Sequence, residues 1–228
     1  VVMHASLHAM TVNSATLRLI GLEDPVLEGI VRDVEGQPNG ELQELPAMHL
    51  VFDALGFDIF DGASSERVLV RYARAARRAG ITTLTDLLNP LSDATVDALR
   101  NATARPDYPV RLVPALNALA WEPEAGSRRL HEVMQHNHER LHCGLVKLVT
   151  DGAIQNFTAR LQWPGYLTGP RNGVWNAPPQ TFHDMVQHYH QAGLQLHVHT
   201  NGDEAVAIIL DALDEALAMW PRPDHRHT

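Results

Sequence analysis

The chain has 228 residues, of which 45% are hydrophobic, enough for a sizeable core in one large domain or in a domain with an appendage. Its 27 acidic and 18 basic residues give a formal net charge of −9, so nucleic acid is not an expected partner. The apolar stretches are interrupted every few residues, and no signal-peptide pattern opens the chain. We therefore expect no membrane partner and a cytoplasmic location. The single cysteine, Cys143, excludes an internal disulfide.

The first part of the chain, residues 1–62, is predicted to be an inserted segment. A short helix is expected over 13–20, where Asn13 is a possible N-cap. A hairpin is expected between 30–34 and 41–44, because Gln37-Pro38-Asn39-Gly40 favours a turn.

From residue 63 to residue 228, strand and helix patterns alternate. Strands are predicted to begin near Ile81, Val110, Leu145 and Leu194. Five helices around these strands are predicted from their caps and apolar faces. Four of them begin at a capping residue or capping box: Ser65, Ser92, Thr181 with Asp184, and Asp203. The fifth lies around 130–141 and carries His131, His136, His138 and His142. This alternation predicts parallel strands joined by right-handed crossovers.

The strand that follows Cys143 carries a lysine among apolar residues. Side chains of a strand alternate between its faces, so Lys147 shares a face with Leu145 and Val149. Burial there lowers the pKa of the amine and favours its neutral, nucleophilic form. Such an amine can take up carbon dioxide, and the resulting carbamate can bridge two divalent metals as a carboxylate does. Lys147 alone could equally be a buried, ion-paired lysine.

The next strand ends in a run of polar residues, His197-Val198-His199-Thr200-Asn201-Gly202-Asp203. His199 is predicted to lie where this strand stops, and an imidazole there could fill a second metal position. His197 shares its face one layer deeper and is expected to be a hydrogen-bonded core residue that supports the site. Asp151, just after the lysine strand, is expected to orient a ligand or to bind the turn by hydrogen bonds.

These residues and three further stretches resemble the amidohydrolase superfamily, in the branch of N-substituted formamide deformylases and exoenzyme regulatory proteins. The further stretches are His8 with Asn13-Ser14-Ala15-Thr16-Leu17, Gly29 to Asp33 with Gly36 to Gly40, and Ala79 to Thr83 with Asp86. The resemblance implies a partial (β/α)8 TIM-like barrel of about four βα units, in the α/β class, with residues 1–62 inserted near the mouth of the active site. It also implies a small-molecule substrate.

The resemblance implies a metal-dependent hydrolase of carbon–nitrogen bonds other than peptide bonds. Family members bind metal through a His-x-His pair on the first barrel strand, the lysine on the fourth, histidines on the fifth and sixth and an aspartate on the eighth. Only Lys147 and His199 of this set are present, so we expect an internal fragment of an enzyme about twice this length. The cofactor implied for the complete enzyme is one or two divalent ions, zinc above all, which make hydroxide from water.

Other residues are assigned to substrate binding. His8 lies in the stretch that resembles a family element near the active-site mouth. Residues 153–179 form a long connection after the lysine strand, and its aromatic residues, which include Trp163 and Tyr166, argue against disorder. This connection is expected to be a lid or specificity wall, or else simple packing over the barrel rim. No residue of the chain is assigned as catalytic.

Two alternatives stay open: a lactone or phosphoester hydrolase on the same scaffold, and a barrel piece that binds a small molecule without turnover. In either case the 228-residue chain by itself is expected to be inert and to bind zinc weakly, because two ligands cannot close a four-coordinate site. Four strands are half a barrel, so we expect Leu145, Val149 and Gln195 to face solvent and the chain to self-associate.

Overall fold

The computed structural model describes residues 1–21, 27–56 and 65–228. The chain divides into two compact units that interleave in sequence. The first comprises 1–59, 149–182 and 199–211, and the second comprises 60–148, 183–198 and 212–228. The division of the chain at residue 62 stays a prediction.

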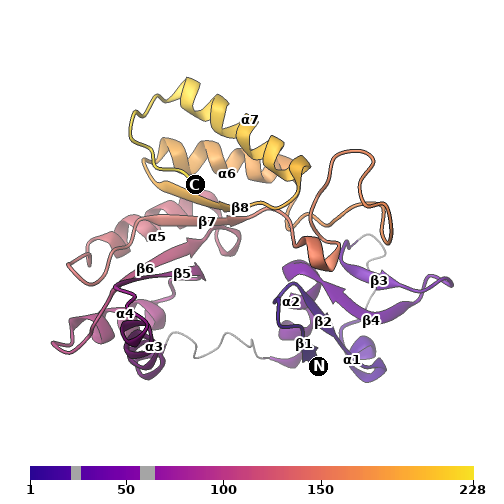
Figure 1. Ribbon diagram of the computed structural model, residues 1–228, viewed down its shortest axis with the longest axis horizontal. Coiled ribbons are helices and arrows are strands. Elements are labelled where there is room, and N and C mark those ends of the chain that lie inside the picture. Colours follow the sequence, from indigo (N-terminus) through magenta and orange to yellow (C-terminus); the bar gives the residue numbers. More distant parts are fainter. Residues whose placement is uncertain (22–26, 57–64) are drawn as a thin grey trace. The chain divides into compact units, whose positions relative to one another are not determined.

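The first unit contains a small antiparallel sheet with strand order β1-β2-β4-β3 (Figure 1). Its elements are β1 (Val2–Met3), β2 (Ala9–Thr11), α1 (Ser14–Leu19), β3 (Ile30–Arg32), β4 (Pro38–Gln43) and α2 (Glu44–Leu55). The predicted hairpin is confirmed as β3 against β4, but its predicted turn over Gln37 to Gly40 was wrong: β4 already begins at Pro38, and the turn lies at 33–37, where the Asp33 N–H donates to the Gln37 carbonyl. The predicted short helix is confirmed as α1, where the Asn13 side chain accepts a hydrogen bond from the Thr16 N–H. The sequence did not predict β1, β2 or α2.

Apolar residues of β2, β4 and α2 form the core of this sheet and its helix. Met10, Leu42, Met48 and Val51 are all buried in it. Residues of β2 and β4 alternate between the core and the outer face, and α2 places its buried residues at helical spacing against them. Glu44, which we expected at the end of a hairpin strand, instead begins α2. Its φ of 63° takes the backbone out of the extended conformation, so the strand ends at Gln43.

The second sheet has four strands in the order β5-β6-β7-β8, and the pairs β5–β6 and β6–β7 are parallel (Figure 1). Its strands are β5 (Thr83–Asn89), β6 (Arg111–Asn117), β7 (Leu145–Val149) and β8 (Gln195–His199). They alternate with the helices α3 (Glu66–Arg78), α4 (Asp93–Ala104), α5 (Pro123–Met134), α6 (Pro179–Gln191) and α7 (Asp203–Met219), and with the 3-10 turns η1 (Ala118–Ala120) and η2 (Ile154–Asn156). The parallel sheet agrees with a partial TIM-like fold, and barrel closure stays a prediction.

Three helix predictions were wrong in detail. The helix α5 ends at Met134, so His136, His138 and His142 lie beyond it; there His138 and Leu141 exchange backbone hydrogen bonds instead. The helix α6 begins at Pro179, before the predicted capping box. Asp203 is the first residue of α7, and its carboxylate accepts from the Gln162 backbone N–H.

The expectation that the inward residues of the lysine strand face solvent was also wrong. All five residues of β7 are buried, Leu145 and Val149 included, and Gln195 is half-buried. Interior strands of parallel sheets are covered on both faces, and β7 has a strand on each side.

The last residues of the chain pair with β8. The Thr228 N–H donates to the Leu196 carbonyl (3.1 Å) and the Val198 N–H donates to the Thr228 carbonyl (2.7 Å), which is the pattern of a parallel ladder. His227 Nδ1 accepts from the Leu196 N–H at 3.0 Å, and the other ring nitrogen of His227 lies 2.8 Å from Nδ1 of the fully buried His190. No helix of the described residues combines the length and apolar character needed to cross a membrane.

Candidate active site

Lys147 lies at the centre of β7 with 5% of its surface exposed. Burial lowers the pKa of its amine to about 8. The side-chain amine of Lys147 has no hydrogen bond or ion pair in the described part of the chain, so the ion-paired alternative has no described partner. The structure therefore places an amine of reduced basicity where the sequence predicted one.

His199 is the last residue of β8 and is half-buried. The ends of the two strands continue their pairing, because the Thr150 backbone N–H (3.1 Å) and hydroxyl (2.8 Å) both donate to the His199 carbonyl. The ring Nε2 of His199 lies 3.2 Å from the Gly152 carbonyl, which also accepts from the Asn201 side-chain amide at 2.7 Å. The turn after β7 therefore fixes the position of the His199 ring.

Asp151 is completely buried and connects this turn to two other segments. Its carboxylate accepts backbone N–H groups of Asn201 (3.0 Å), Gly202 (2.8 Å) and Arg160 (2.9 Å). Of the two roles considered for Asp151, these bonds match the second, in which it binds the turn. Because Asn201 and Gly202 follow His199 closely, the same bonds also limit where His199 can move.

A second histidine lies beside His199. The rings of His8 and His199 have centroids 5.6 Å apart and are tilted by 31°. His8 Nδ1 lies 3.1 Å and 3.0 Å from the two carboxylate oxygens of Glu44. This hydrogen bond, helped by the charges of Glu44 and Asp151 and opposed by burial, raises the pKa of the His8 imidazole. The first unit thus brings together two residues that the sequence predicted separately.

Two more residues complete this group, and sequence reasoning missed both. The first is Glu44, which is 1% exposed. The second is Asn176, whose side-chain amide nitrogen donates to the Asp151 carbonyl (3.2 Å) and lies 3.5 Å from the Glu44 carboxylate. The Asn176 side-chain oxygen is buried and has no hydrogen-bond partner among the described residues. Glu44 gave no signal, because it was assigned to a hairpin strand, and Asn176 lies in the connection 153–179, where no periodicity marks it.

The connection 153–179 is ordered by its own contacts. Arg160 forms a two-pronged ion pair with Glu204 (3.0 and 3.2 Å) and lies 5.0 Å from the Trp175 ring centroid. The Tyr166 hydroxyl donates to the Ala159 carbonyl, whereas the side chain of Trp163 is 94% exposed. The roles of Trp163 and Tyr166 in substrate binding, and of the segment as a lid, stay predictions.

The two predicted ligands suit a divalent metal by their chemistry. A lysine of lowered pKa can form a carbamate, and a histidine bonded to a backbone carbonyl through one ring nitrogen is typical of metal-binding histidines. No group of three or more His, Cys, Asp or Glu residues able to hold a metal occurs among residues 1–21, 27–56 and 65–228. The metal roles of Lys147 and His199 therefore stay predictions, as does the supporting role of His197, which is half-buried on β8.

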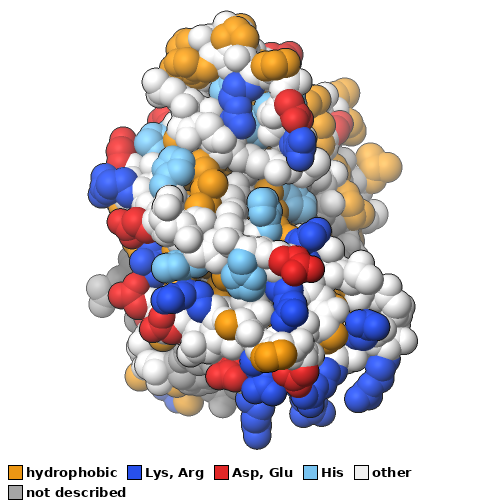
Figure 2. Space-filling view, turned by 90° about the vertical axis from the view of Figure 1, so that its left-hand side faces the viewer, with side chains coloured by type: hydrophobic (Ala, Val, Ile, Leu, Met, Phe, Trp, Pro, Cys, Tyr) orange, Lys and Arg blue, Asp and Glu red, His pale blue; other side chains and the backbone are white. Residues whose placement is uncertain are grey.

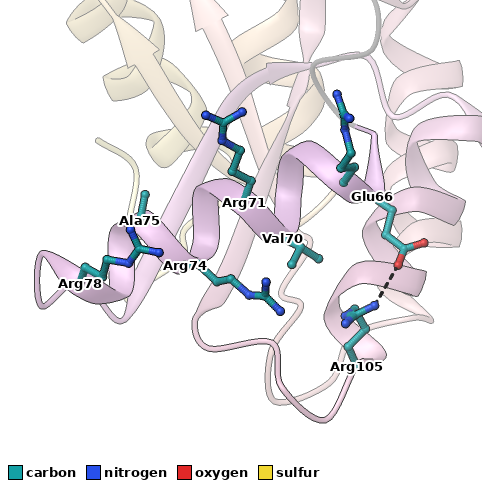
Figure 3. Close-up of a pocket in the computed structure, with 8 residues that line it drawn as sticks. Glu66, Val70, Arg71, Arg74, Ala75, Arg78 and Arg105 are labelled. Atoms are coloured by element: carbon teal, nitrogen blue, oxygen red, sulfur yellow. Dashed lines mark ion pairs between the residues drawn. The ribbon is translucent and has the colours of Figure 1, made fainter.

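A groove of about 850 Å³ lies elsewhere, along α3 in the second unit (Figure 3). Arg67, Arg71, Arg74 and Arg78 follow one another at helical spacing beside it, and Arg105 pairs with Glu66 across it (3.5 Å). Basic side chains also gather at the lower end of the face in Figure 2. A groove lined by arginines suits anionic groups, and neither predicted metal ligand lines it.

The fold and site together define a class: α/β proteins with a parallel sheet in which polar residues follow the strand ends. The model of the amidohydrolase family matches residues 1–228, and the chain belongs to this family. This confirms the superfamily that the sequence resembles; the particular branch stays a prediction.

Three curated relatives have similar sequences. Protein LONG AFTER FAR-RED 3 of Arabidopsis thaliana is 27% identical over 96% of this chain and 39% of its own length. Putative amidohydrolase YtcJ of Bacillus subtilis (strain 168) is 26% identical over 91% of this chain and 39% of its own. Exoenzymes regulatory protein AepA of Pectobacterium carotovorum subsp. carotovorum is 28% identical over 93% of this chain and 46% of its own. The chain thus spans less than half the length of each.

Two solved structures share the fold. They are uncharacterized metal-dependent hydrolases from Pyrococcus horikoshii OT3 and Pyrococcus furiosus, each with a TM-score of 0.59 over 92% of this chain. They are 17% and 21% identical to it, and 40% and 42% of their own chains are covered. At this identity the likeness shows the fold alone.

Proposed function

We propose that the chain is part of a metal-dependent hydrolase that cleaves amide-like carbon–nitrogen bonds other than peptide bonds. The observation that carries the proposal is the buried Lys147 of lowered pKa in a chain of the amidohydrolase family. A metal-binding carbamate needs such a lysine, whereas an ordinary core position would hold an apolar residue.

Each residue has a defined task in this proposal. Lys147, as its carbamate, and His199 bind one or two divalent ions, of which zinc suits an imidazole ligand well. Such an ion, when bound, supplies a nucleophile from water near neutral pH and polarises the scissile carbonyl. Asp151 keeps the turn after His199 in place, and His8, Trp163 and Tyr166 bind the substrate.

Two other functions remain as alternatives on the same scaffold. A lactone or phosphoester hydrolase would use the same metal ligands on a different electrophile. A non-catalytic member would bind a small molecule without turnover. The family match supports a hydrolase over the second alternative, because putative amidohydrolase YtcJ is among the relatives.

The test compares three substrate classes on a protein of the relatives' length that carries this sequence. N-substituted formamides and acetamides, a lactone series and a phosphoester series are assayed at neutral pH, before and after removal of metal by a chelator and after zinc is restored. We expect hydrolysis of the amides, its loss with the chelator and its return with zinc. Hydrolysis of the lactones or phosphoesters alone would favour the first alternative. Absence of turnover with all three series would contradict the proposal that the protein is an enzyme.

A further inference from the structure

We propose that Glu44 is a positioning residue that holds the imidazole of His8 in place as a substrate-binding group beside His199. The inference deepens the proposed function and rests on it, since it concerns the substrate of the same site. It assigns a role to Glu44 and gives His8 a defined geometry.

Glu44 and His8 are joined at two points. The Glu44 backbone N–H donates to the His8 carbonyl at 3.0 Å. The Glu44 carboxylate accepts a hydrogen bond from His8 Nδ1, which lies within 3.1 Å of both carboxylate oxygens. A buried carboxylate is costly unless it is paired, and Glu44 is 1% exposed. With the backbone and the side chain both engaged, the His8 ring has little freedom to turn away.

The backbone of Glu44 adopts a conformation that is unfavourable for its residue type. Its φ of 63° lies in the left-handed region, which glycine and asparagine occupy at far lower cost than glutamate. Strained residues of this kind persist where the surrounding structure enforces them, and they cluster at functional sites. The strain at Glu44 serves to direct a carboxylate toward His8.

The packing around the carboxylate connects the pair to His199. Gly152 lies against Glu44 so closely that a Cβ there would collide with the Glu44 carboxylate and with Thr158. The carbonyl of the same glycine lies 3.2 Å from the His199 ring and accepts from Asn201. One residue therefore sets the distance between the Glu44–His8 pair and His199.

This geometry leaves one atom of His8 for the substrate. Nδ1 faces Glu44 whether or not the ring is protonated, and Nε2 has no hydrogen-bond partner among the described residues. The ring is half-buried and borders His199, where the proposed reaction occurs. His8 Nε2 is thus placed to form a hydrogen bond to a polar group next to the scissile bond of an amide substrate.

The first experiment measures the His8 ring itself by nitrogen-15 NMR of the histidine side chains in the 228-residue chain. The wild type is expected to show His8 with Nδ1 protonated. Glu44→Gln keeps an oxygen that can accept from Nδ1–H and should preserve this state, whereas Glu44→Ala should return the ring toward the Nε2–H tautomer that free neutral histidine prefers. Identical His8 signals in all three proteins would overturn the positioning role.

The second experiment measures kinetics in the protein of the relatives' length, with the amide that it hydrolyses best. His8→Ala is expected to lower kcat/KM about 10- to 100-fold, the range for loss of a strong hydrogen bond. Glu44→Ala should cause a similar loss and Glu44→Gln a smaller one. The double variant His8→Ala/Glu44→Ala should be no worse than His8→Ala, because both act through one imidazole.

Two controls separate the possible failures. Glu41→Ala, on β4 three residues before Glu44 and outside the Glu44–His8 pair, should leave kcat/KM unchanged, and metal content should be equal in all variants. Hydrolysis by the wild type with unchanged kinetics in His8→Ala and Glu44→Ala would overturn this inference alone. Absence of hydrolysis in the wild type would overturn the proposed function, and the substrate role of His8 with it. Loss of metal from the His8 variants would mean a structural effect and would also contradict the inference.

Discussion

At the scale of single residues, the chemistry of Lys147 was predictable and its surroundings were not. Alternation along an apolar strand places the lysine in the interior, and the structure buries it with a pKa lowered to about 8. Glu44 could not be found in this way, because its role depends on an unusual φ and on contacts with His8 and Gly152, which are distant in sequence. Local patterns carry no information on such contacts.

The buried carboxylate of Asp151 provides the first prediction. Asp151→Asn replaces a charged acceptor of three backbone N–H groups by an amide with one acceptor oxygen. We expect a loss of about 2 kcal/mol in the free energy of unfolding, measured by urea denaturation monitored by tryptophan fluorescence. The matched control is Asp33→Asn, because the Asp33 carboxylate accepts hydrogen bonds from backbone N–H groups in an exposed turn. This control should lower the free energy of unfolding by less. Equal effects would show that burial of Asp151 does not matter.

At the scale of elements, periodicity predicted the parallel strands and most helices, and it failed at their ends. The strand predicted from Ile81 begins at Thr83, and the helix predicted around 130–141 is α5, which ends at Met134. Histidines beyond α5 have no helical pattern of their own and were assigned by proximity to it. The alternation of strands and helices predicted parallel pairing, which the pairs β5–β6 and β6–β7 confirm, whereas β1 and β2 are too short for a period-2 pattern to mark them.

The pairing of the chain's last residues with β8 gives a pH prediction. Burial, more than the positive charges of His225, His190 and Arg222, lowers the pKa of His227 to about 4. An unfolded histidine titrates near pH 6.5, so the unfolded chain binds a proton as the pH falls while folded His227 stays neutral. This contribution to stability is complete above pH 6.5 and is lost progressively as the pH falls toward 4.

We therefore expect the free energy of unfolding to fall by about 1 to 2 kcal/mol between pH 7 and pH 4.5 on account of His227. The measurement is a series of urea titrations across this range. His227→Phe should show a shallower decline over the same interval, whereas His183→Gln, at an exposed ion pair with Glu215, should not. A decline of equal slope in wild type and His227→Phe would contradict the assignment.

At the scale of the whole molecule, the resemblance predicted membership of the amidohydrolase superfamily, and the family match confirms this membership. The sequence could not show which parts of the chain form compact units, because the two units are assembled from interleaved segments. The metal centre is likewise only partly predictable: the family pattern names Lys147 and His199, and the described residues offer no larger cluster of ligands.

Self-association of the 228-residue chain is proposed from its sheet edges. In the described sheet β5 has one neighbour, β6, so its other edge is unpaired, and open edges promote pairing between chains. Light scattering over a concentration series should show a mass that rises with concentration. Thr85→Lys, an exposed position of β5, should reduce this rise, since a charge on an edge strand opposes pairing. A mass equal to one chain at every concentration would contradict the proposal.

The most direct test of the central claim, a metal-dependent hydrolase with Lys147 and His199 as ligands, is the metal content of a protein of the relatives' length that carries this sequence. Elemental analysis compares the wild type with Lys147→Ala, His199→Ala and the control His131→Ala on α5. We expect one or two divalent ions per chain in the wild type and the control, fewer in Lys147→Ala and His199→Ala, and hydrolysis reduced at least about 100-fold in both ligand variants. Unchanged metal content and turnover in Lys147→Ala would contradict the account and make Lys147 a structural residue.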